Sequence, residues 1–274
     1  MRRRFRQVDV FSDRLGFGNP LAVVADADDL ADDEMARFAR WTNLSETTFL
    51  LQPTQAGADY RVRIFTPGGE LPFAGHPTIG SCHTWLALGG VPNSSHNRAR
   101  VRGRARPTAA RRRLPGIHCS TSPATRRSFQ RSFGDRGRPG IDPSTVLRSQ
   151  VLDNGPDWVT LQLDSAESVL AVERASASAL PYKIGLVGRY SSGDADVEVR
   201  AFAYPVGVPE DPLTGSLNAS VAQWLVAEGV LPNSYVASHG TALGRAGRVH
   251  VTVDDQATWI GGRVTPGVEG TVAL

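Results

Sequence analysis

Two short stretches of the chain place a polar side chain that can exchange a proton directly before a proline. They read His76-Pro-Thr-Ile-Gly-Ser81 and Asp211-Pro-Leu-Thr-Gly-Ser216, and their Pro, Gly and Ser residues coincide when one hexamer is set on the other. The side chains of His76 and Asp211 can each exchange a proton or cap a helix. Proline favours a helix start, because its dihedral is pre-set and it has no N–H to leave unpaired. The expected chemistry is proton exchange beside helix N-termini, which attract anions.

An uncharged run follows each hexamer. It extends to Gly90 in the first copy and to Ala227 in the second, without Asp, Glu, Lys or Arg. A helix with no charged face has no side for water, so we expect both helices to be buried all round. At about 14 to 16 residues, each is too short to cross a bilayer. The sequence therefore predicts two buried helices, one in each half, that direct free backbone N–H groups toward a carboxylate or a phosphate.

A further acid, Glu46, lies just before an apolar strand, in Asn43-Leu-Ser-Glu-Thr-Thr-Phe-Leu50. Short hydroxyl residues surround it. A single Glu at the start of a strand is more often a solvated surface residue than a catalytic one. Its type and position alone therefore give Glu46 no role, and any role depends on the residues that the fold brings near it.

The rest of the chain indicates the elements that must position these residues. Acidic residues begin an amphipathic helix over 32–41, whose apolar face is Met35, Phe38 and Ala39. Alternating apolar residues predict strands over 60–65, 158–163, 197–202, 249–253 and 270–274. Strands dominate and each half has one buried helix. We therefore expect a mixed α/β (α+β) fold with largely antiparallel sheets curled around a helix.

Length and composition bound the class of protein. The 274 residues allow one large domain or two ordinary ones, and 41% apolar residues suffice for real cores. The first residues, Met1-Arg-Arg-Arg-Phe-Arg, lack the apolar region of a signal peptide, and no transmembrane segment is predicted. The two cysteines, Cys82 and Cys119, have no metal-ligand spacing. We expect a cytoplasmic, reduced protein.

Residues 94–140 fit none of these patterns, since they are dense in Arg, Pro and Ser and show no hydrophobic period. Between Arg98 and Arg138 lie 13 Arg and one Asp, a charge of +12, so the rest of the chain carries −9 against a total of +3. The segment is a disordered basic insert, a nucleic-acid-binding arm or a stretch translated out of frame. We favour the third hypothesis, because the patterned sequence stops and resumes abruptly. It is wrong if neither other frame of the gene encodes alternating apolar strands across 94–140.

Six motifs together resemble those of the PhzF family, the phenazine-biosynthesis-like isomerases. They are Gly18-Asn-Pro20, Asn43-Leu-Ser-Glu-Thr-Thr-Phe49, Phe65-Thr-Pro67, Glu70-Leu-Pro-Phe-Ala-Gly-His-Pro-Thr78, Glu210-Asp-Pro-Leu-Thr-Gly-Ser216 and Gly240-Thr-Ala-Leu-Gly-Arg245. The resemblance covers about residues 5–92 and 140–274 and departs completely over 94–140. His239 stands where the family pattern would place a Gln, which is a smaller departure.

The resemblance implies the diaminopimelate-epimerase-like fold, in which two pseudo-symmetric domains each curl a sheet around a central helix, with the site in the cleft between them. It implies an isomerase without cofactor or metal, in which Glu46 is the general acid/base that moves a proton within a small carboxylated substrate. His76 and Asp211 would face that substrate from the two domains. Its oxygens would be held by Ser45, Gly75, Gly215 and Ser216.

The sequence patterns and the resemblance together give the expected domain bounds, partners and alternative functions. The N-terminal domain is expected over 1–93 plus about 264–274, and the C-terminal domain over 141–263, with a homodimer and no membrane partner. One alternative is an epimerase or racemase on the same scaffold, although His76 and Asp211 stand where related two-thiol enzymes have Cys. The others are a nucleic-acid-binding protein acting through 94–140, although we expect no nucleic-acid partner, and an inactive relic. Asp211 alone could be an N-cap, while Gly80 and Gly215 could serve helix packing only.

Overall fold

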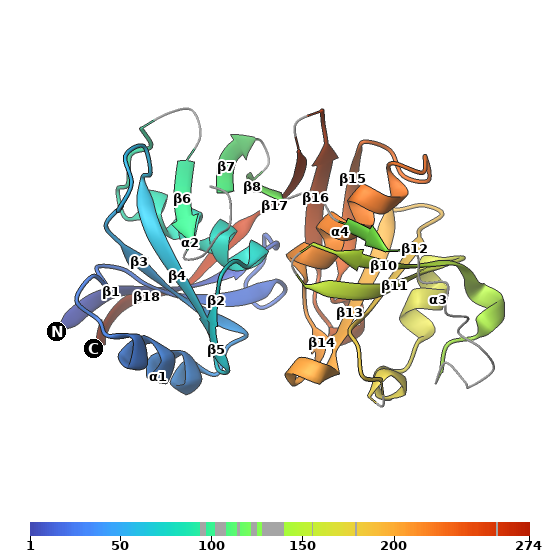
Figure 1. Cartoon of the computed structure of the whole chain (residues 1–274), viewed down its shortest axis with the longest axis horizontal. Helices are drawn as coiled ribbons and strands as arrows, with labels where there is room; N and C mark the ends of the chain where they lie inside the picture. The colour runs from blue at the N-terminus through green and yellow to red at the C-terminus, as the bar shows by residue number, and fades with distance from the viewer. Residues whose placement is uncertain are drawn as a thin grey trace. The chain divides into compact units, whose positions relative to one another are not determined.

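The computed structural model describes residues 1–93, 97–101, 108–113, 116–121, 125–127, 140–154, 156–178, 180–255 and 257–274, with the backbone alone over 97–127. The chain forms two compact units (Figure 1). Unit 1 is Met1–Ser120 with Gly261–Leu274, and unit 2 is Thr121–Ile260. Each unit is a curled, mostly antiparallel sheet that packs on one buried helix. The predicted α+β fold class with two pseudo-symmetric halves is therefore confirmed.

The sheet of unit 1 is built on β4. This strand pairs antiparallel with β3 on one edge, and on the other edge antiparallel with β5 and parallel with β6. β3 pairs parallel with β2, which pairs antiparallel with β1, and β1 pairs antiparallel with β18. The strands are β1 (Arg2–Val10), β2 (Asn19–Val24), β3 (Glu46–Leu51), β4 (Tyr60–Thr66), β5 (Gly69–Leu71), β6 (Asn97–Val101), β7 (Thr108–Arg113), β8 (Gly116–Thr121) and β18 (Val264–Ala273).

Two helices cover the two faces of this sheet. The amphipathic helix α1 (Asp32–Thr42) buries Met35, Phe38 and Ala39, as predicted from its apolar face, against side chains that include Phe49. The uncharged helix α2 (Gly75–Ala87) packs on β1 to β4. On that face Ser81 Oγ lies 2.9 Å from Thr48 Oγ1. Because side chains alternate along a strand, Glu46 points to the same face as Thr48, toward α2.

Unit 2 repeats this topology. β13 pairs antiparallel with β12, and on its other edge antiparallel with β14 and parallel with β15. β12 pairs parallel with β11, which pairs antiparallel with β10. The uncharged helix α4 (Gly215–Leu225) is almost wholly buried, and α3 (Ala166–Ala171) packs on β12 and β13. The strands are β9 (Thr125–Arg127), β10 (Val146–Asp153), β11 (Asp157–Leu163), β12 (Ile184–Arg189), β13 (Val197–Ala203), β14 (Val208–Asp211), β15 (Ser234–His239), β16 (Gly247–Val253) and β17 (Thr258–Gly262).

The register of the repeat differs from the predicted one. In unit 1 Ile64 pairs with Leu71, and in unit 2 the equivalent Ala201 pairs with Asp211. Asp211 therefore corresponds to Leu71, whereas His76 corresponds to Ser216, the second residue of α4. The alignment of His76 with Asp211 that the two hexamers predicted is wrong, because the shared prolines lie on different sides of the helix start. Pro77 is inside α2, but Pro212 precedes α4.

An ion pair marks the true register. Arg63 of β4 forms a bidentate pair with Glu70, both N–O distances being 2.8 Å, and Arg200 of β13 forms one with Glu210 at 2.8 and 3.1 Å. Each glutamate lies five residues before the glycine that begins the central helix. The pair thus fixes the strand return that leads into each helix.

The hypotheses on residues 94–140 fall largely outside the described residues. Within that range the backbone describes β6 to β9, with β6 antiparallel to β7, β7 to β8, and β9 to β10. Whether the segment is read out of frame remains a prediction about the gene. Among the described residues, no helix is long and apolar enough to cross a membrane.

Candidate active site

Glu46 is a buried carboxylic acid at the start of β3, where it pairs with Leu21 of β2. Its side chain is 15% exposed and faces α2. Burial raises the pKa of Glu46 to about 7, because a buried carboxylate loses its hydration, while a hydrogen bond from Ser45 acts in the opposite direction. A carboxyl group with this pKa can both accept and donate a proton near neutral pH.

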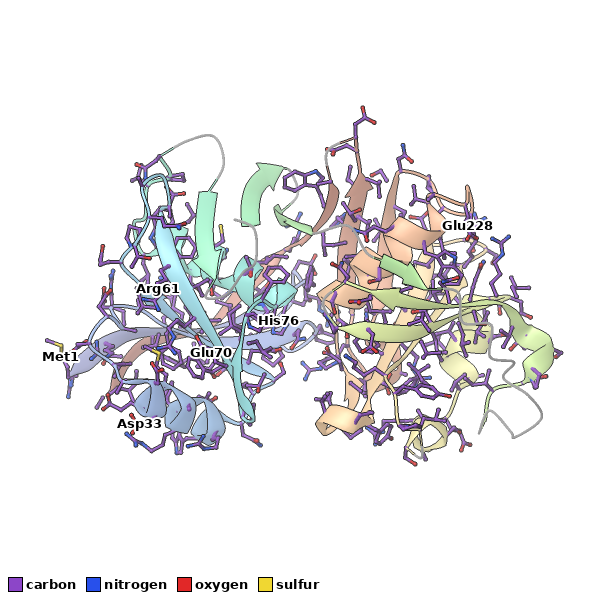
Figure 2. All side chains as sticks on the ribbon, in the orientation of Figure 1. Met1, Asp33, Arg61, Glu70, His76 and Glu228 are labelled. Atoms are coloured by element: carbon purple, nitrogen blue, oxygen red, sulfur yellow. The ribbon has the colours of Figure 1, made fainter. Side chains whose placement is uncertain are left out.

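His76, which is labelled in Figure 2, is the second residue of α2 and contacts Glu46. Its Nε2 is 3.3 Å from Glu46 Oε2, and its Nδ1 is 3.4 Å from Asn19 Nδ2. Ser45 Oγ donates to Asn19 Oδ1 at 3.3 Å, which directs the amide nitrogen toward the imidazole. An amide nitrogen only donates, so Nδ1 accepts and the neutral ring carries its proton on Nε2, facing the carboxyl group.

Asn19 is a member of this cluster to which sequence reasoning gave no role. It is fully buried, and the loop before it is held by Asp9, whose Oδ2 accepts from the backbone N–H of Gly16 at 2.6 Å and of Gly18 at 3.0 Å. A Cβ at Gly18 would lie 2.3 Å from the carbonyl oxygen of Val10, so only glycine fits there. The Gly18-Asn-Pro20 turn was the available signal, but it did not reveal that Asn19 faces His76.

The first turn of α2 has no side-chain cap, so its backbone N–H groups can attract an anion. The helix begins at Gly75, and its N-cap is Ala74, whose methyl side chain cannot accept a hydrogen bond from the first turn. Ser45, Glu46, Gly75 and His76 therefore belong to one region of unit 1. This arrangement places a proton-exchanging pair beside backbone N–H groups that attract a carboxylate.

The predicted residues of unit 2 lie around the start of α4. Asp211 ends β14, and its carboxylate accepts from the backbone N–H of Leu213 at 3.1 Å and from Thr214 Oγ1 at 2.7 Å. Gly215 and Ser216 are the first two residues of α4, and Thr214 is its N-cap. Asp211 is thus not the helix cap that we considered as its alternative role, because it stabilises the turn before the helix. That Asp211, Gly215 and Ser216 act with Glu46 on one substrate remains a prediction.

Two further residues of α2 could do chemistry: Cys82 is packed into the core, whereas His83, which we expect in the core from its place in the uncharged run, is only half-buried. Cys82 is 2% exposed, and burial raises the pKa of its thiol to about 12. Such a thiol stays protonated at neutral pH and cannot serve as a base. Gly80 packs against β1 and β2, since a Cβ there would lie 2.6 Å from Leu21 Cδ2. Among the described residues, no group of three or more His, Cys, Asp or Glu is arranged to hold a metal ion.

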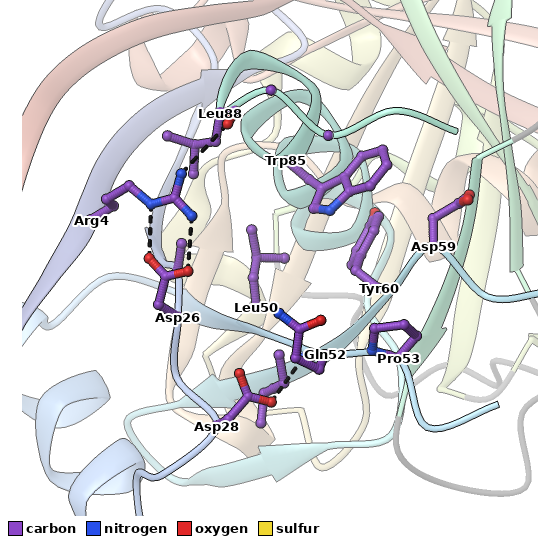
Figure 3. Close-up of a pocket in the computed structure, with 14 residues that line it drawn as sticks. Arg4, Asp26, Asp28, Leu50, Gln52, Pro53, Asp59, Tyr60, Trp85 and Leu88 are labelled. Atoms are coloured by element: carbon purple, nitrogen blue, oxygen red, sulfur yellow. Dashed lines mark hydrogen bonds and ion pairs between the residues drawn. The ribbon is translucent and has the colours of Figure 1, made fainter. Parts of the chain in front are cut away.

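A cavity of about 200 Å³ lies in another part of unit 1, near the C-terminal end of α2 (Figure 3). Tyr60 and Trp85 stack on one side of it with ring centroids 5.2 Å apart. Its carboxylates already have structural partners, since Asp26 pairs with Arg4 and Asp28 accepts from the backbone N–H of Gln52. None of the predicted site residues lines this cavity.

Comparisons with known proteins agree with this fold. A family model described as phenazine biosynthesis-like protein matches residues 8–270. The Antisense-enhancing sequence 1 protein of Schizosaccharomyces pombe is 35% identical over 289 residues, covering 97% of each chain. The trans-2,3-dihydro-3-hydroxyanthranilate isomerase of Pseudomonas aeruginosa is 32% identical over 256 residues, covering 92% of this chain and 90% of the relative.

Solved structures show the same architecture. A PhzF family protein of Bacillus anthracis superposes with a TM-score of 0.82 at 20% identity, covering 100% of both chains. A predicted epimerase of Pseudomonas aeruginosa superposes with a TM-score of 0.76 at 26% identity, covering 99% of both. Fold and relatives together define an isomerase- or epimerase-type enzyme. The chain belongs to the phenazine biosynthesis-like (PhzF) family and is an isomerase.

Proposed function

We propose that this isomerase moves a proton within a small carboxylated substrate without a cofactor, and that Glu46 is its general acid/base. The observation that carries the proposal is the buried Glu46 carboxyl group, with a pKa of about 7, beside His76 at the start of an uncharged helix. The ionised carboxylate would remove a proton from an activated carbon of the substrate. The resulting carboxylic acid, whose proton can exchange with water, would deliver a proton to another carbon, so the enzyme ends in its starting state.

His76 would assist this transfer from its place on α2. Its Nε2–H faces Glu46 and can donate to the ionised carboxylate or to a hydroxyl or amine of the substrate. Ser45 and the backbone N–H of Gly75 would hold substrate oxygens on the same side. From unit 2, Asp211, Gly215 and Ser216 would complete the site in a cleft between the units.

The substrate class follows from helix chemistry and from one relative. Helix N-termini favour a negatively charged group, which supports a carboxylate. The Pseudomonas aeruginosa relative is named for trans-2,3-dihydro-3-hydroxyanthranilate, a small carboxylated molecule with an amine and a hydroxyl group. We propose a substrate of this kind.

The test is deuterium incorporation from D2O, with trans-2,3-dihydro-3-hydroxyanthranilate as the first compound and other small acids after it. Wild-type protein should introduce deuterium at the carbon that receives the proton, and Glu46→Gln should abolish incorporation because an amide cannot act as a general acid or base near neutral pH. Glu167→Gln, which changes an exposed glutamate of α3, is the matched control and should leave the rate unchanged. Equal rates in wild type and Glu46→Gln would remove Glu46 from the mechanism.

An epimerase is the second candidate, favoured by the predicted epimerase among the structural relatives. The same assay separates the two reactions. An isomerase gives a product with a moved double bond, whereas an epimerase returns the starting constitution with one centre inverted and labelled. The buried thiol of Cys82 does not favour a two-thiol racemase.

Three further predictions concern the state and partners of the protein. A homodimer is expected and can be checked by light scattering. Binding of nucleic acid through 94–140 would appear as an affinity that falls steeply with salt and disappears when the segment is deleted. An inactive relic would show no deuterium incorporation with any acid tested.

A further inference from the structure

Lys183 is the single lysine of the chain, and it lies at the position of unit 2 that corresponds to Glu46. It directly precedes β12, and its backbone carbonyl accepts from the backbone N–H of Val159 at 2.9 Å, which continues the parallel pairing of β12 with β11. Its side chain is 18% exposed. Lysine is seldom buried to this degree unless it has partners, so the groups around it decide what it does.

The side chain of Lys183 faces α4. Side chains alternate along a strand, so Lys183 and Gly185 point to the same face of the sheet. A Cβ on Gly185 would lie 2.4 Å from Cδ1 of Leu217, in the first turn of α4. In unit 1 the two residues at the positions equivalent to Lys183 and Ser216 are in contact at 3.3 Å. The repeat therefore places the ammonium group beside the start of α4, next to Ser216.

Hydrogen-bond donors gather around this ammonium group. Trp158 lies opposite Lys183 on β11, and the centre of its ring is 5.4 Å from Nζ. The indole is buried, and among the described residues no acceptor lies within hydrogen-bond distance of its Nε1. Thr214, the N-cap of α4, donates its hydroxyl to Asp211 and does not accept from the first turn of the helix. A ligand that accepts hydrogen bonds would complete this part of unit 2.

The ion pair between Lys183 and Asp157 does not account for this arrangement. Nζ lies 3.5 Å from Asp157 Oδ1, and the side chain of Asp157 is 74% exposed. A solvated pair of this kind contributes little to stability. An ammonium group carries three N–H donors, so it can contact Asp157 and bind a second acceptor at the same time.

We propose that Lys183 binds the carboxylate of the substrate at the start of α4. The ammonium group supplies a positive charge, and the backbone N–H groups of Gly215 and Ser216 supply directed donors, so a carboxylate can be held through both of its oxygens. The inference rests on the proposed function, because it names the side chain that recognises the carboxylated substrate. The equivalent positions of the two units then have different roles, since Glu46 exchanges the proton and Lys183 holds the anion.

The first experiment reads Lys183 directly, because the chain has one lysine. Full-length protein labelled with 13C at the lysine Cε gives one resonance, from Lys183. Anthranilate, a stable aromatic carboxylate, is titrated into it, and anthranilamide, its neutral carboxamide, is the matched ligand. We expect anthranilate to shift the resonance and anthranilamide to leave it in place. A resonance that stays in place up to about 20 mM anthranilate, or that moves equally with both ligands, overturns the inference.

The second experiment measures affinity for anthranilate by calorimetry. Lys183→Met should weaken binding by about tenfold or more, because it removes one partner of a close charge pair, and Lys183→Arg should stay within about threefold of wild type. Arg189→Met, which removes an exposed cation at the other end of β12, is the matched control and should bind like wild type. Equal binding by wild type and a folded Lys183→Met variant overturns the inference. If that variant does not fold, the titration of the wild-type protein decides.

The third experiment links this contact to turnover in the deuterium assay. Lys183→Met should lower kcat/KM by about tenfold through KM, with kcat within about threefold of wild type, because the lost contact is to a part of the substrate that does not react. A fall in kcat at unchanged KM overturns the binding role. If Glu46→Gln is as fast as wild type, the proposed function fails, and the titration and the affinities still decide whether Lys183 holds a carboxylate.

Discussion

At the scale of single residues, the pKa of Glu46 has a direct consequence for catalysis. In the proposed mechanism Glu46 must be ionised before it can remove a proton, and its carboxyl group is half ionised at its pKa of about 7. We predict that kcat/KM rises about tenfold per pH unit below this value and levels off above it. The pH profile of deuterium incorporation measures this. A midpoint near 4.5, the ordinary value for a glutamate, would show that the base is exposed or is another group.

The same shift predicts how stability depends on pH. The folded protein holds the Glu46 proton up to about pH 7, whereas the unfolded chain releases it near 4.5, so the folded state binds more protons between these values. The contribution of Glu46 to the free energy of unfolding is therefore fully present below about pH 4.5. It is lost as the pH rises through about 7, and the loss is at most about 3 kcal/mol. Glu46→Gln should lack this loss and become the more stable protein above pH 7.

Urea unfolding of wild type and Glu46→Gln at several pH values checks the prediction. The control is Glu167→Gln, whose difference from wild type should stay constant with pH. If the difference in unfolding free energy between Glu46→Gln and wild type stays constant from about pH 4.5 to about pH 7, burial does not raise the pKa of Glu46.

At the scale of elements, the loop between β1 and β2 positions Asn19 and tolerates only glycine at Gly18. We predict that Gly18→Ala destabilises the protein by about 2 kcal/mol or more, because its Cβ would clash with the backbone carbonyl of Val10 and displace Asn19. Gly68→Ala is the matched control, since the nearest atom to a Cβ there is 3.5 Å away. It should stay within about 0.5 kcal/mol of wild type.

Thermal unfolding measures this stability, and kcat reports the displacement of Asn19. Since Asn19 orients the imidazole of His76, Gly18→Ala should also lower kcat, whereas Gly68→Ala should not. Equal behaviour of the two variants would show that the loop yields to the extra methyl group.

Features that depend on residues close together in the sequence could be predicted, whereas contacts between distant segments could not. The burial of α4 was predictable, because an uncharged run leaves a helix no face for water, but the last turn of α2, over 85–87, is half-buried or exposed. The contact between Asn19 and His76 was not predictable, since it depends on the parallel pairing of β2 with β3 and on the packing of α2 across them. The register of the repeat was misread because proline was given more weight than the glutamate that precedes each helix by five residues.

At the scale of the whole molecule, two units share a topology but differ in their chemistry. Thr47 pairs with Phe65 in unit 1 as Ile184 pairs with the equivalent Phe202 in unit 2, so Glu46 corresponds to Lys183. Ser216 likewise corresponds to His76. Among the described residues, the two positions of unit 2 that correspond to Glu46 and His76 therefore hold Lys183 and Ser216, and the repeat shares the scaffold rather than this pair of side chains.

The scaffold element common to both units is the arginine–glutamate pair before each central helix, and the two copies differ in burial. The side chains of Arg200 and Glu210 are 3% and 2% exposed, whereas those of Arg63 and Glu70 are 4% and 22% exposed. Arg200 also donates to the backbone carbonyls of Val169 and Val172, at 3.0 and 2.6 Å. Removing Arg200 therefore leaves a buried carboxylate and buried carbonyls unpaired.

We predict that Arg200→Met costs about 3 to 5 kcal/mol of stability and that Arg63→Met costs clearly less, because water can reach Glu70. Changing both partners, in Arg200→Met with Glu210→Met, should recover part of the loss, since an apolar pair leaves no charge without a partner. Urea unfolding of the three variants beside wild type measures these differences. Equal losses for Arg200→Met and Arg63→Met, or a double variant as unstable as the sum of its single changes, would contradict the argument. The ion pair would then contribute through packing, and the burial of its carboxylate would not be what separates the two units.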